Sequence, residues 1–335
     1  MKNTEDAEFY KKNGFAIFKN LLSAEEVSHY YSLMQNVFPD VTSNCTEAGQ
    51  SFFSWGLADG IRKRKEFWPL IWQENILKKV RKVLGDEIKF CIHNDLHYNI
   101  TQAAFEDGNP QKVSGWHRDS RFRGQLLSRR SWFDKIRGLG YKNIWDESEH
   151  PVRMARLGIY LTSYGEHQTP LFLIPGSHLS ERSLSSVFER LLWNKLVSGI
   201  RCFLQGDRRP RIFPYIRSKS HPFCLPAKPF KALMNAGDAV LFDMRMIHGI
   251  GKRSGERVAM FLDYGFENIH TFDHINYYLK ERKDMVYLNP TPPELEKKLK
   301  EKKLFLEGWE SFKGSPMTGR MAKKPEQKIL DMYNM

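Results

Sequence analysis

In the first quarter of the chain, the spacing of apolar and polar positions predicts short helices with one strand between the first two. The run AEFYKKNGF predicts a helix that ends at Gly14, since glycine readily adopts the left-handed conformation of a helix C-terminus. FAIFKNLL then predicts a short strand, and SAEEVSHYYSLM predicts a second helix in which Ser23 and Glu26 form a capping box. Residues 66–84 predict further helical structure that closes at Gly85.

From about residue 87 the pattern changes to short segments rich in β-branched and aromatic residues, separated by Gly, Pro and Asn. These segments are IKFCIHNDLHYNI, RMARLGIYLTSY, TPLFLIPGSH, KALMNAGDAVLFDMRMIHG and RVAMFLDYGFE. Many short strands with turn signals between them are typical of a jelly roll, in which two antiparallel sheets face each other. The sequence therefore predicts a mainly β fold with flanking helices.

Two long insertions interrupt this pattern, at about 120–152 and 180–230. The first is rich in arginine and lysine, and the second carries an apolar stripe at helical spacing followed by further arginines. The stripe consists of Leu184, Phe188, Leu191, Leu192, Leu196, Ile200 and Phe203. We expect one domain over residues 1–290 that includes both insertions. A charged tail, helical and then irregular, follows over residues 291–335.

Composition favours a globular protein of a reducing compartment. Hydrophobic residues make up 41% of the 335 positions, enough for a sizeable core. The four cysteines are scattered without a C-x-x-C pair, which argues against a disulfide framework or a structural zinc site. The N-terminus lacks the apolar segment of a signal peptide, and no apolar run reaches membrane-spanning length. We expect a cytoplasmic protein, with peripheral contact to a membrane left open.

The net charge of +13 and the pI near 9.4 predict an anionic partner or surface. Nucleic acid, an acidic lipid surface and a phosphorylated metabolite would all satisfy that charge. Nucleic acid is the least favoured of the three, because the basic residues lie in insertions without a recognisable nucleic-acid module. The amphipathic stripe of the second insertion fits either a helix packed on its own core or one that lies on a membrane. The oligomeric state stays open.

Candidate chemistry centres on His117-Arg118-Asp119, which is followed more than a hundred residues later by His248 and Arg257. The Gly- and Pro-containing loop before the H-x-D motif predicts that a strand begins at His117, and we expect His248 at the end of its strand. Two imidazoles and one carboxylate suit iron(II), because they occupy one face of an octahedron and leave three positions open. An arginine nine residues after the second histidine offers a planar fork to a carboxylate.

The order H-x-D, IPGSH, GD followed by an apolar strand and HG, and then arginine resembles the phytanoyl-CoA dioxygenase family. The opening FYKKNGFAIFKNLLSAEEV is also similar to that family, and the resemblance covers roughly residues 8–268. It implies a double-stranded β-helix, also described as a cupin-like jelly roll. It further implies an enzyme that uses iron(II), 2-oxoglutarate as co-substrate, and O₂.

Carried over residue by residue, the resemblance makes His117, Asp119 and His248 the catalytic metal ligands. Arg257 then binds the C5 carboxylate of 2-oxoglutarate. The rival for that role is Arg253, which lies within a turn between two glycines and fits a solvated position better.

Two further residues, Tyr160 and Thr162, share one face of their strand and are candidates for contact with the co-substrate, although core packing is the better single explanation for each of them. Because Asp119 is a carboxylate, not the small residue of related halogenases, the resemblance implies hydroxylation or another oxidation. The predicted reaction oxidises an unactivated C–H bond of a small, anionic or lipid-linked substrate and releases succinate and CO₂. The alternatives are a nucleic-acid-directed oxygenase of the same type and a non-catalytic, ligand-binding relative of the fold.

Other polar residues have simpler interpretations. His93-Asn94-Asp95 is a second H-x-D, with His97 on the same strand face, but it lacks the preceding Gly/Pro loop and fits satisfied strand residues better than metal ligands. His178 of PGSH fits a turn or packing residue, and Asp238 fits a turn cap.

Overall fold

The computed structural model describes residues 5–39, 53–101, 114–117, 119, 152–163, 171–178, 230–250, 255–276, 278–279 and 287–309. The interiors of both predicted insertions, including the apolar stripe between Leu184 and Phe203, lie outside the described residues. Within the described ranges, no helix is both long enough and apolar enough to cross a membrane.

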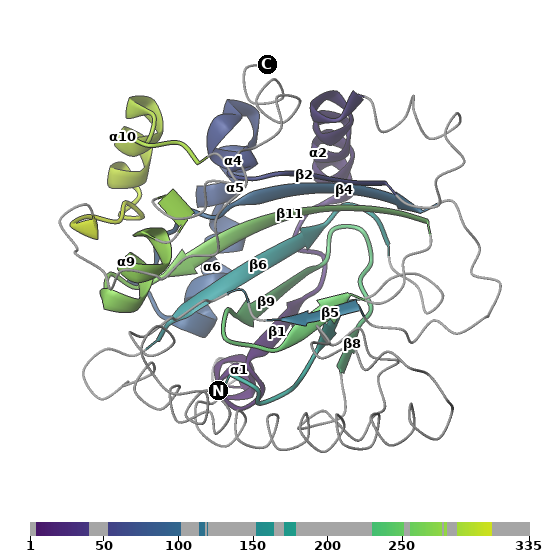
Figure 1. The fold of residues 1–335 in the computed structure, drawn as a ribbon, viewed down its shortest axis with the longest axis horizontal. Helices are drawn as coiled ribbons and strands as arrows, with labels where there is room; N and C mark the ends of the chain where they lie inside the picture. The colour runs from purple at the N-terminus through teal and green to yellow at the C-terminus, as the bar shows by residue number, and fades with distance from the viewer. Residues whose placement is uncertain are drawn as a thin grey trace, which may run out of the picture.

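Two antiparallel sheets form the centre of the molecule (Figure 1). The larger has the strand order β1 (Phe15–Phe18), β9 (Ala239–Asp243), β6 (Met154–Tyr160), β11 (Gly255–Gly265), β4 (Asp95–Thr101) and β2 (Phe53–Leu57), with β3 (Lys89–Phe90) also paired to β11. The smaller has the order β5 (Ser114–His117), β10 (His248–Ile250), β7 (Leu171–Leu173) and β8 (Phe230–Ala232). The prediction of a mainly antiparallel β fold with flanking helices is confirmed.

Strict alternation along the larger sheet separates its two faces. On β6, Leu157 and Ile159 join the apolar cluster beneath the helices, whereas Tyr160 joins a second cluster on the other face. Arg156 and Gly158 have the same parity as Tyr160 and therefore lie on that second face.

Helices cover the first face. They are α2 (Ala24–Val37), α4 (Gly60–Lys63), the short η2 (Lys65–Phe67), α5 (Pro69–Trp72) and α6 (Glu74–Leu84). Buried Ile76, Leu77 and Val80 of α6 belong to the same cluster as Leu157. In Figure 1 the helices α4, α5 and α6 lie behind the larger sheet, and strands β5 and β8 of the smaller sheet lie in front of it.

The second apolar cluster joins the two sheets. It contains Phe15, Val240 and Phe242 of the larger sheet together with Leu171 and Leu173 of the smaller one. An apolar core therefore fills the space between the sheets, and any polar side chain on this inner face must be paired there.

The predicted N-terminal elements are confirmed. Helix α1 (Glu5–Asn13) ends before Gly14, whose φ of +84° favours glycine. At the start of α2 the Ser23 side chain accepts from the Glu26 amide, and the Glu26 carboxylate accepts from the Ser23 amide, which completes the capping box.

The C-terminal segment packs on the main core as far as it is described. Helix α10 (Pro293–Glu301) buries Leu295 and Leu299 in the cluster that also holds the helices of the first face. The preceding helix, α9 (Ile269–Asn276), lies beside it at one end of the larger sheet (Figure 1). The predicted charged helix after residue 291 is therefore present, whereas the domain boundary at 290 stays a prediction.

Three local predictions were wrong. His117 ends strand β5, where a strand beginning at this residue was expected. His248 opens β10 and does not end the strand before it, because β9 stops at Asp243. His93 lies outside any strand: its φ of +90° breaks the extended segment between β3 and β4.

Gly158 tests how tightly the inner face of the larger sheet is packed. A methyl group added there would lie 2.9 Å from Cε1 of Phe261, closer than normal contact. We expect Gly158→Ala to lower the free energy of unfolding by about 1–3 kcal/mol, as overpacking does. Denaturant unfolding would measure the change. Gly56→Ala on β2 is the control, since among the described residues its added methyl would come nearest to His97, at an ordinary contact distance of 3.8 Å. Equal stability losses in the two variants would contradict the prediction.

Candidate metal centre

Antiparallel register brings polar residues from three strands together on the inner face of the larger sheet. Asp263 of β11 lies directly opposite Arg156 of β6, and Arg257 lies opposite Asn99 of β4. His97 lies opposite Ala259, which in turn lies opposite Tyr160. Directly opposed residues share a face, so these side chains project toward the smaller sheet.

His248 is the first residue of β10 in the smaller sheet and is 5% exposed. Its Nδ1 lies 3.1 Å from the carbonyl oxygen of Met246. A carbonyl can only accept, so Nδ1 carries a proton and Nε2 is the nitrogen that faces Asp119. This is the arrangement of a histidine that binds a metal through Nε2.

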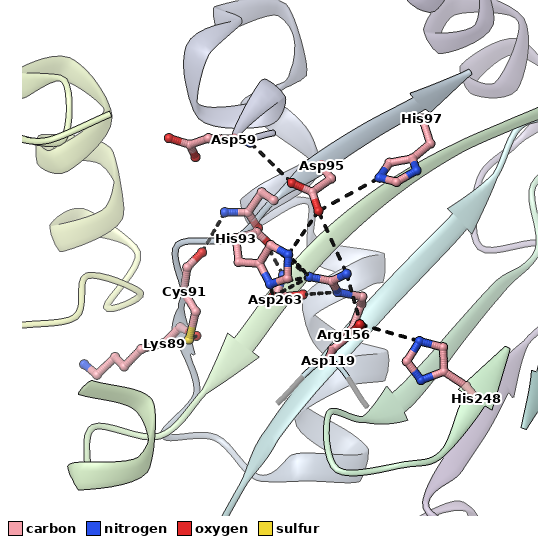
Figure 2. Close-up of polar contacts among 11 residues, drawn as sticks. Asp59, Lys89, Cys91, His93, Asp95, His97, Asp119, Arg156, His248 and Asp263 are labelled. Atoms are coloured by element: carbon pink, nitrogen blue, oxygen red, sulfur yellow. Dashed lines mark hydrogen bonds and ion pairs between the residues drawn. The ribbon is translucent and has the colours of Figure 1, made fainter. Parts of the chain in front are cut away.

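Asp119 lies beside that nitrogen, as Figure 2 shows. Its Oδ1 is 3.5 Å from Nε2 of His248, and its side chain is 10% exposed. Donor atoms on one face of an octahedron, each about 2.0–2.2 Å from the metal, are separated by roughly 3 Å. The pair therefore fits a shared metal ion.

Only the backbone position of His117, the third predicted ligand, is described. The register of β5 and β10 places His117 directly opposite His248, and its side chain lies outside the described residues. Two of the three predicted ligands thus lie together, and the third lies in the neighbouring strand. The ligand assignment as a whole stays a prediction.

Arg257 is 4% exposed on the inner face, with its guanidinium carbon 5.8 Å from the ring centroid of Tyr160. Burial raises the pKa of Tyr160, while the charge of Arg257 and a hydrogen bond with it act in the opposite direction. Thr162 has its hydroxyl oxygen 3.0 Å from the amide of Val258, from which it accepts a hydrogen bond. The rival Arg253 lies outside the described residues. A buried guanidinium beside a phenol suits a carboxylate ligand.

Sequence reasoning missed a buried ionic network around Arg156 (Figure 2). Arg156 donates to Asp263 from Nε at 2.9 Å and from Nη2 at 3.1 Å, and its Nη1 lies 3.1 Å from Oδ2 of Asp119. His93 adds an ion pair with Asp95 at 3.2 Å. The one available signal was an arginine inside the apolar stretch RMARLGIY, a position where charge is unusual.

His93 belongs to this network, so the interpretation of its H-x-D as satisfied residues agrees with its contacts. Burial and Arg156 lower the pKa of His93, but Asp95 and Asp263 outweigh them and the pKa ends above its usual value. Burial lowers the pKa of His274 well below its usual range, and nearby His93 and Arg156 add to the effect.

Donor atoms of His93, Asp263 and His274 lie within 4.8 Å of one another, close enough for a metal ion. A positive group already occupies this place, because Nη2 of Arg156 lies 2.8 Å from Nε2 of His93 and 3.1 Å from Asp263.

Two other predicted polar residues have structural contacts. His178 packs against Gly14 and has its Nε2 3.0 Å from the Lys11 carbonyl oxygen. Asp238 accepts from the amides of Asn20 and Asn235 and so closes its turn. The predictions of a packing residue and a turn cap are confirmed.

A histidine and a carboxylate that converge from two segments, with a buried arginine on the facing sheet, fit the class of mononuclear metal sites with imidazole and carboxylate donors. The phytanoyl-CoA dioxygenase (PhyH) family model matches residues 10–259. The chain belongs to this family. It is therefore an enzyme of the 2-oxoglutarate oxygenase type, and its metal and co-substrates are iron(II), 2-oxoglutarate and O₂.

Several solved structures are similar in fold. HygX from Streptomyces hygroscopicus with iron bound has 14% identity and a TM-score of 0.49, over 78% of this chain and 86% of the other. The epimerase SnoN from nogalamycin biosynthesis has 13% identity and a TM-score of 0.47, over 79% and 84%. EctD from S. alaskensis in its apoform has 16% identity and a TM-score of 0.45, over 78% and 76%. No protein with a curated description matches the chain significantly.

Metal binding provides the direct test of the site. We expect His248→Ala to weaken Co(II) or Fe(II) binding by at least about a hundredfold, since loss of a ligand should cost no less than loss of an outer partner. Calorimetric titration of the metal-free protein would measure it. The variant should keep its circular dichroism spectrum, because one donor is lost and the apolar cores remain. His178→Ala is the control histidine, and wild-type affinity in His248→Ala would contradict the assignment.

Proposed function

We propose that the protein hydroxylates, or otherwise oxidises, an unactivated C–H bond of a small organic substrate, with release of succinate and CO₂. The observation that carries this proposal is the approach of Asp119 Oδ1 to His248 Nε2 at 3.5 Å on the inner side of the two sheets. An intact carboxylate at this position leaves no vacant ligand place for a halide, which favours transfer of oxygen to the substrate.

We also propose a specific architecture for the fold, the double-stranded β-helix. The two antiparallel sheets are the two halves of a double-stranded β-helix, and the apolar cluster between them is its interior. Support comes from the strand orders and from the site, which draws Asp119 and His248 from the smaller sheet's side and Arg257 from the larger sheet.

Each residue then has one task. His117, Asp119 and His248 hold iron(II), and the Met246 carbonyl keeps His248 in the required tautomer. Arg257 binds the distal carboxylate of 2-oxoglutarate through its fork, beside Tyr160. When bound, iron(II) and 2-oxoglutarate supply the activation of O₂, with one oxygen atom entering succinate and the other the substrate. The surrounding side chains exclude water and fix the orientation of the reactants.

Succinate release with a panel of candidate substrates tests the activity. Turnover should depend on iron(II), 2-oxoglutarate and O₂ and should be absent in Asp119→Ala. Oxidised product in proportion to succinate would support hydroxylation. If the chain were a non-catalytic relative of the fold, the ligand would bind without succinate production. A nucleic-acid-directed oxygenase would instead respond to oligonucleotides in the same panel.

Arg257→Lys tests the co-substrate site. Lysine keeps the positive charge but loses the planar fork, so we expect the apparent 2-oxoglutarate requirement to rise about tenfold or more while iron affinity stays within about twofold. The matched control is Arg253→Lys, which should leave both quantities unchanged. If only the Arg253 variant raises the requirement, the role moves to that residue.

The net charge of +13 supports an anionic or lipid-linked substrate and peripheral contact with an anionic membrane. The basic residues concerned are in the insertions, outside the described part of the chain. Near an acidic bilayer, each lysine or arginine contributes on the order of 1 kcal/mol to binding.

Vesicle binding separates this substrate class from a small soluble one. We expect sedimentation with vesicles that contain phosphatidylserine, weakening as salt rises, and no sedimentation with neutral vesicles. Replacing Arg208, Arg209, Arg211 and Arg217 by Glu should reduce the binding. No sedimentation at low salt would leave a small soluble substrate as the better assignment.

A further inference from the structure

Arg156 is a charged side chain in a strand that is otherwise buried. All seven residues of β6 are buried, and Arg156 is 7% exposed. Taking a guanidinium out of water is costly unless it is paired, so its partners fix its position. Those partners lie on the inner face of the larger sheet, where Asp119 approaches from the side of the smaller sheet.

Asp263 determines the plane of the guanidinium. It is fully buried and lies directly across the strand pair from Arg156. Its two oxygens accept from Nε at 2.9 Å and Nη2 at 3.1 Å, which is the two-bond fork that only arginine forms. The guanidinium is planar, so the two bonds to Asp263 also fix the direction of its third nitrogen.

That third nitrogen, Nη1, lies 3.1 Å from Oδ2 of Asp119 and 3.9 Å from Oδ2 of Asp95. The two oxygens of Asp119 are therefore divided between two neighbours. Oδ2 pairs with Arg156, and Oδ1 lies 3.5 Å from Nε2 of His248. Figure 2 shows Asp119 between the arginine and the histidine.

We propose that Arg156, anchored by Asp263, is a positioning residue that holds the Asp119 carboxylate with only one oxygen toward the metal. This inference rests on the proposed function, since it assumes that Asp119 and His248 are ligands. A carboxylate without the guanidinium could rotate and bind the metal through both oxygens, filling a position that 2-oxoglutarate or O₂ requires. Arg156 on β6 and Asp263 on β11 would thus orient Asp119, which belongs to neither strand.

Co(II) binding to the metal-free protein tests the proposal without turnover. The visible absorption of Co(II) changes with coordination number, so it reports how Asp119 binds. We expect Arg156→Leu and Arg156→Lys to weaken Co(II) binding by about tenfold to a hundredfold and to alter the spectrum, as loss of an outer partner does. Lysine should not rescue, because it keeps the charge and loses the fork. Asp263→Asn, which removes the anchor, should show the same spectral change.

Arg245 provides the matched control. It is buried and makes the same fork, to Asp243, with bonds of 2.9 and 2.8 Å. Arg245→Lys should lower the melting temperature much as Arg156→Lys does, and it should leave the Co(II) spectrum unchanged. A purely structural role for Arg156 would make the two variants behave alike.

The outcomes separate the two proposals. If wild-type protein binds Co(II) and the Arg156 and Asp263 variants keep its affinity and spectrum, the positioning role is wrong and the metal centre stands. Tighter binding without Arg156 would also overturn the role, because the arginine would then only repel the metal. If the wild-type protein does not bind Co(II), the metal centre itself fails. Should Arg156→Leu not fold, the Lys and Asn variants decide the result.

Discussion

The larger sheet is buried on both faces, and this constraint shapes the rest of the molecule. One face meets helices such as α6, and the other meets the smaller sheet across an apolar cluster. Because side chains alternate along a strand, successive residues point to opposite faces of the sheet. A polar residue of the inner parity, such as Arg156 or Asp263, therefore has no route to bulk water and must find its partner inside.

Charge pairing then determines how the polar side chains between the sheets are arranged. Three carboxylates surround the guanidinium of Arg156: Asp95 and Asp263 belong to the larger sheet, and Asp119 comes from the side of the smaller sheet. His93 joins the same network through Asp95. Breaking one partner of a buried pair costs about 3–5 kcal/mol, so the network resists rearrangement. A rigid ion-pair network around Asp119 would suit a metal enzyme of this family. A metal with open positions lacks a full set of protein ligands, so neighbouring side chains must fix the orientation of the ligands that it has.

The outer parts of the fold could be predicted because their signals are local. Gly14 and the capping box of Ser23 and Glu26 depend on residues within one helical turn, and the structure has both. The site was predictable in part: Asp119 and His248 were named from their motifs, and they lie together. His117 and Arg257 are placed where their strands carry them, on β5 and β11. The predicted strand boundary near His248 was wrong because Asp243 and His248 are separated by a turn, which the nearly continuous apolar run in the sequence conceals.

By itself the sequence determined the family, the strand-rich fold and the candidate ligands, since these depend on residue types in a fixed order. Only the tertiary structure decided the role of Arg156. Its partners Asp119 and Asp263 are 37 and 107 positions away. Strand register makes Asp263 its neighbour, and the packing of the smaller sheet's side against the larger sheet brings Asp119 to it. The same holds for His93, where a positive φ turns an apparent second metal motif into a member of the ionic network. The local sequence pattern predicts which face of a sheet a side chain points to. Its partner on that face depends on how segments distant in the sequence pack together.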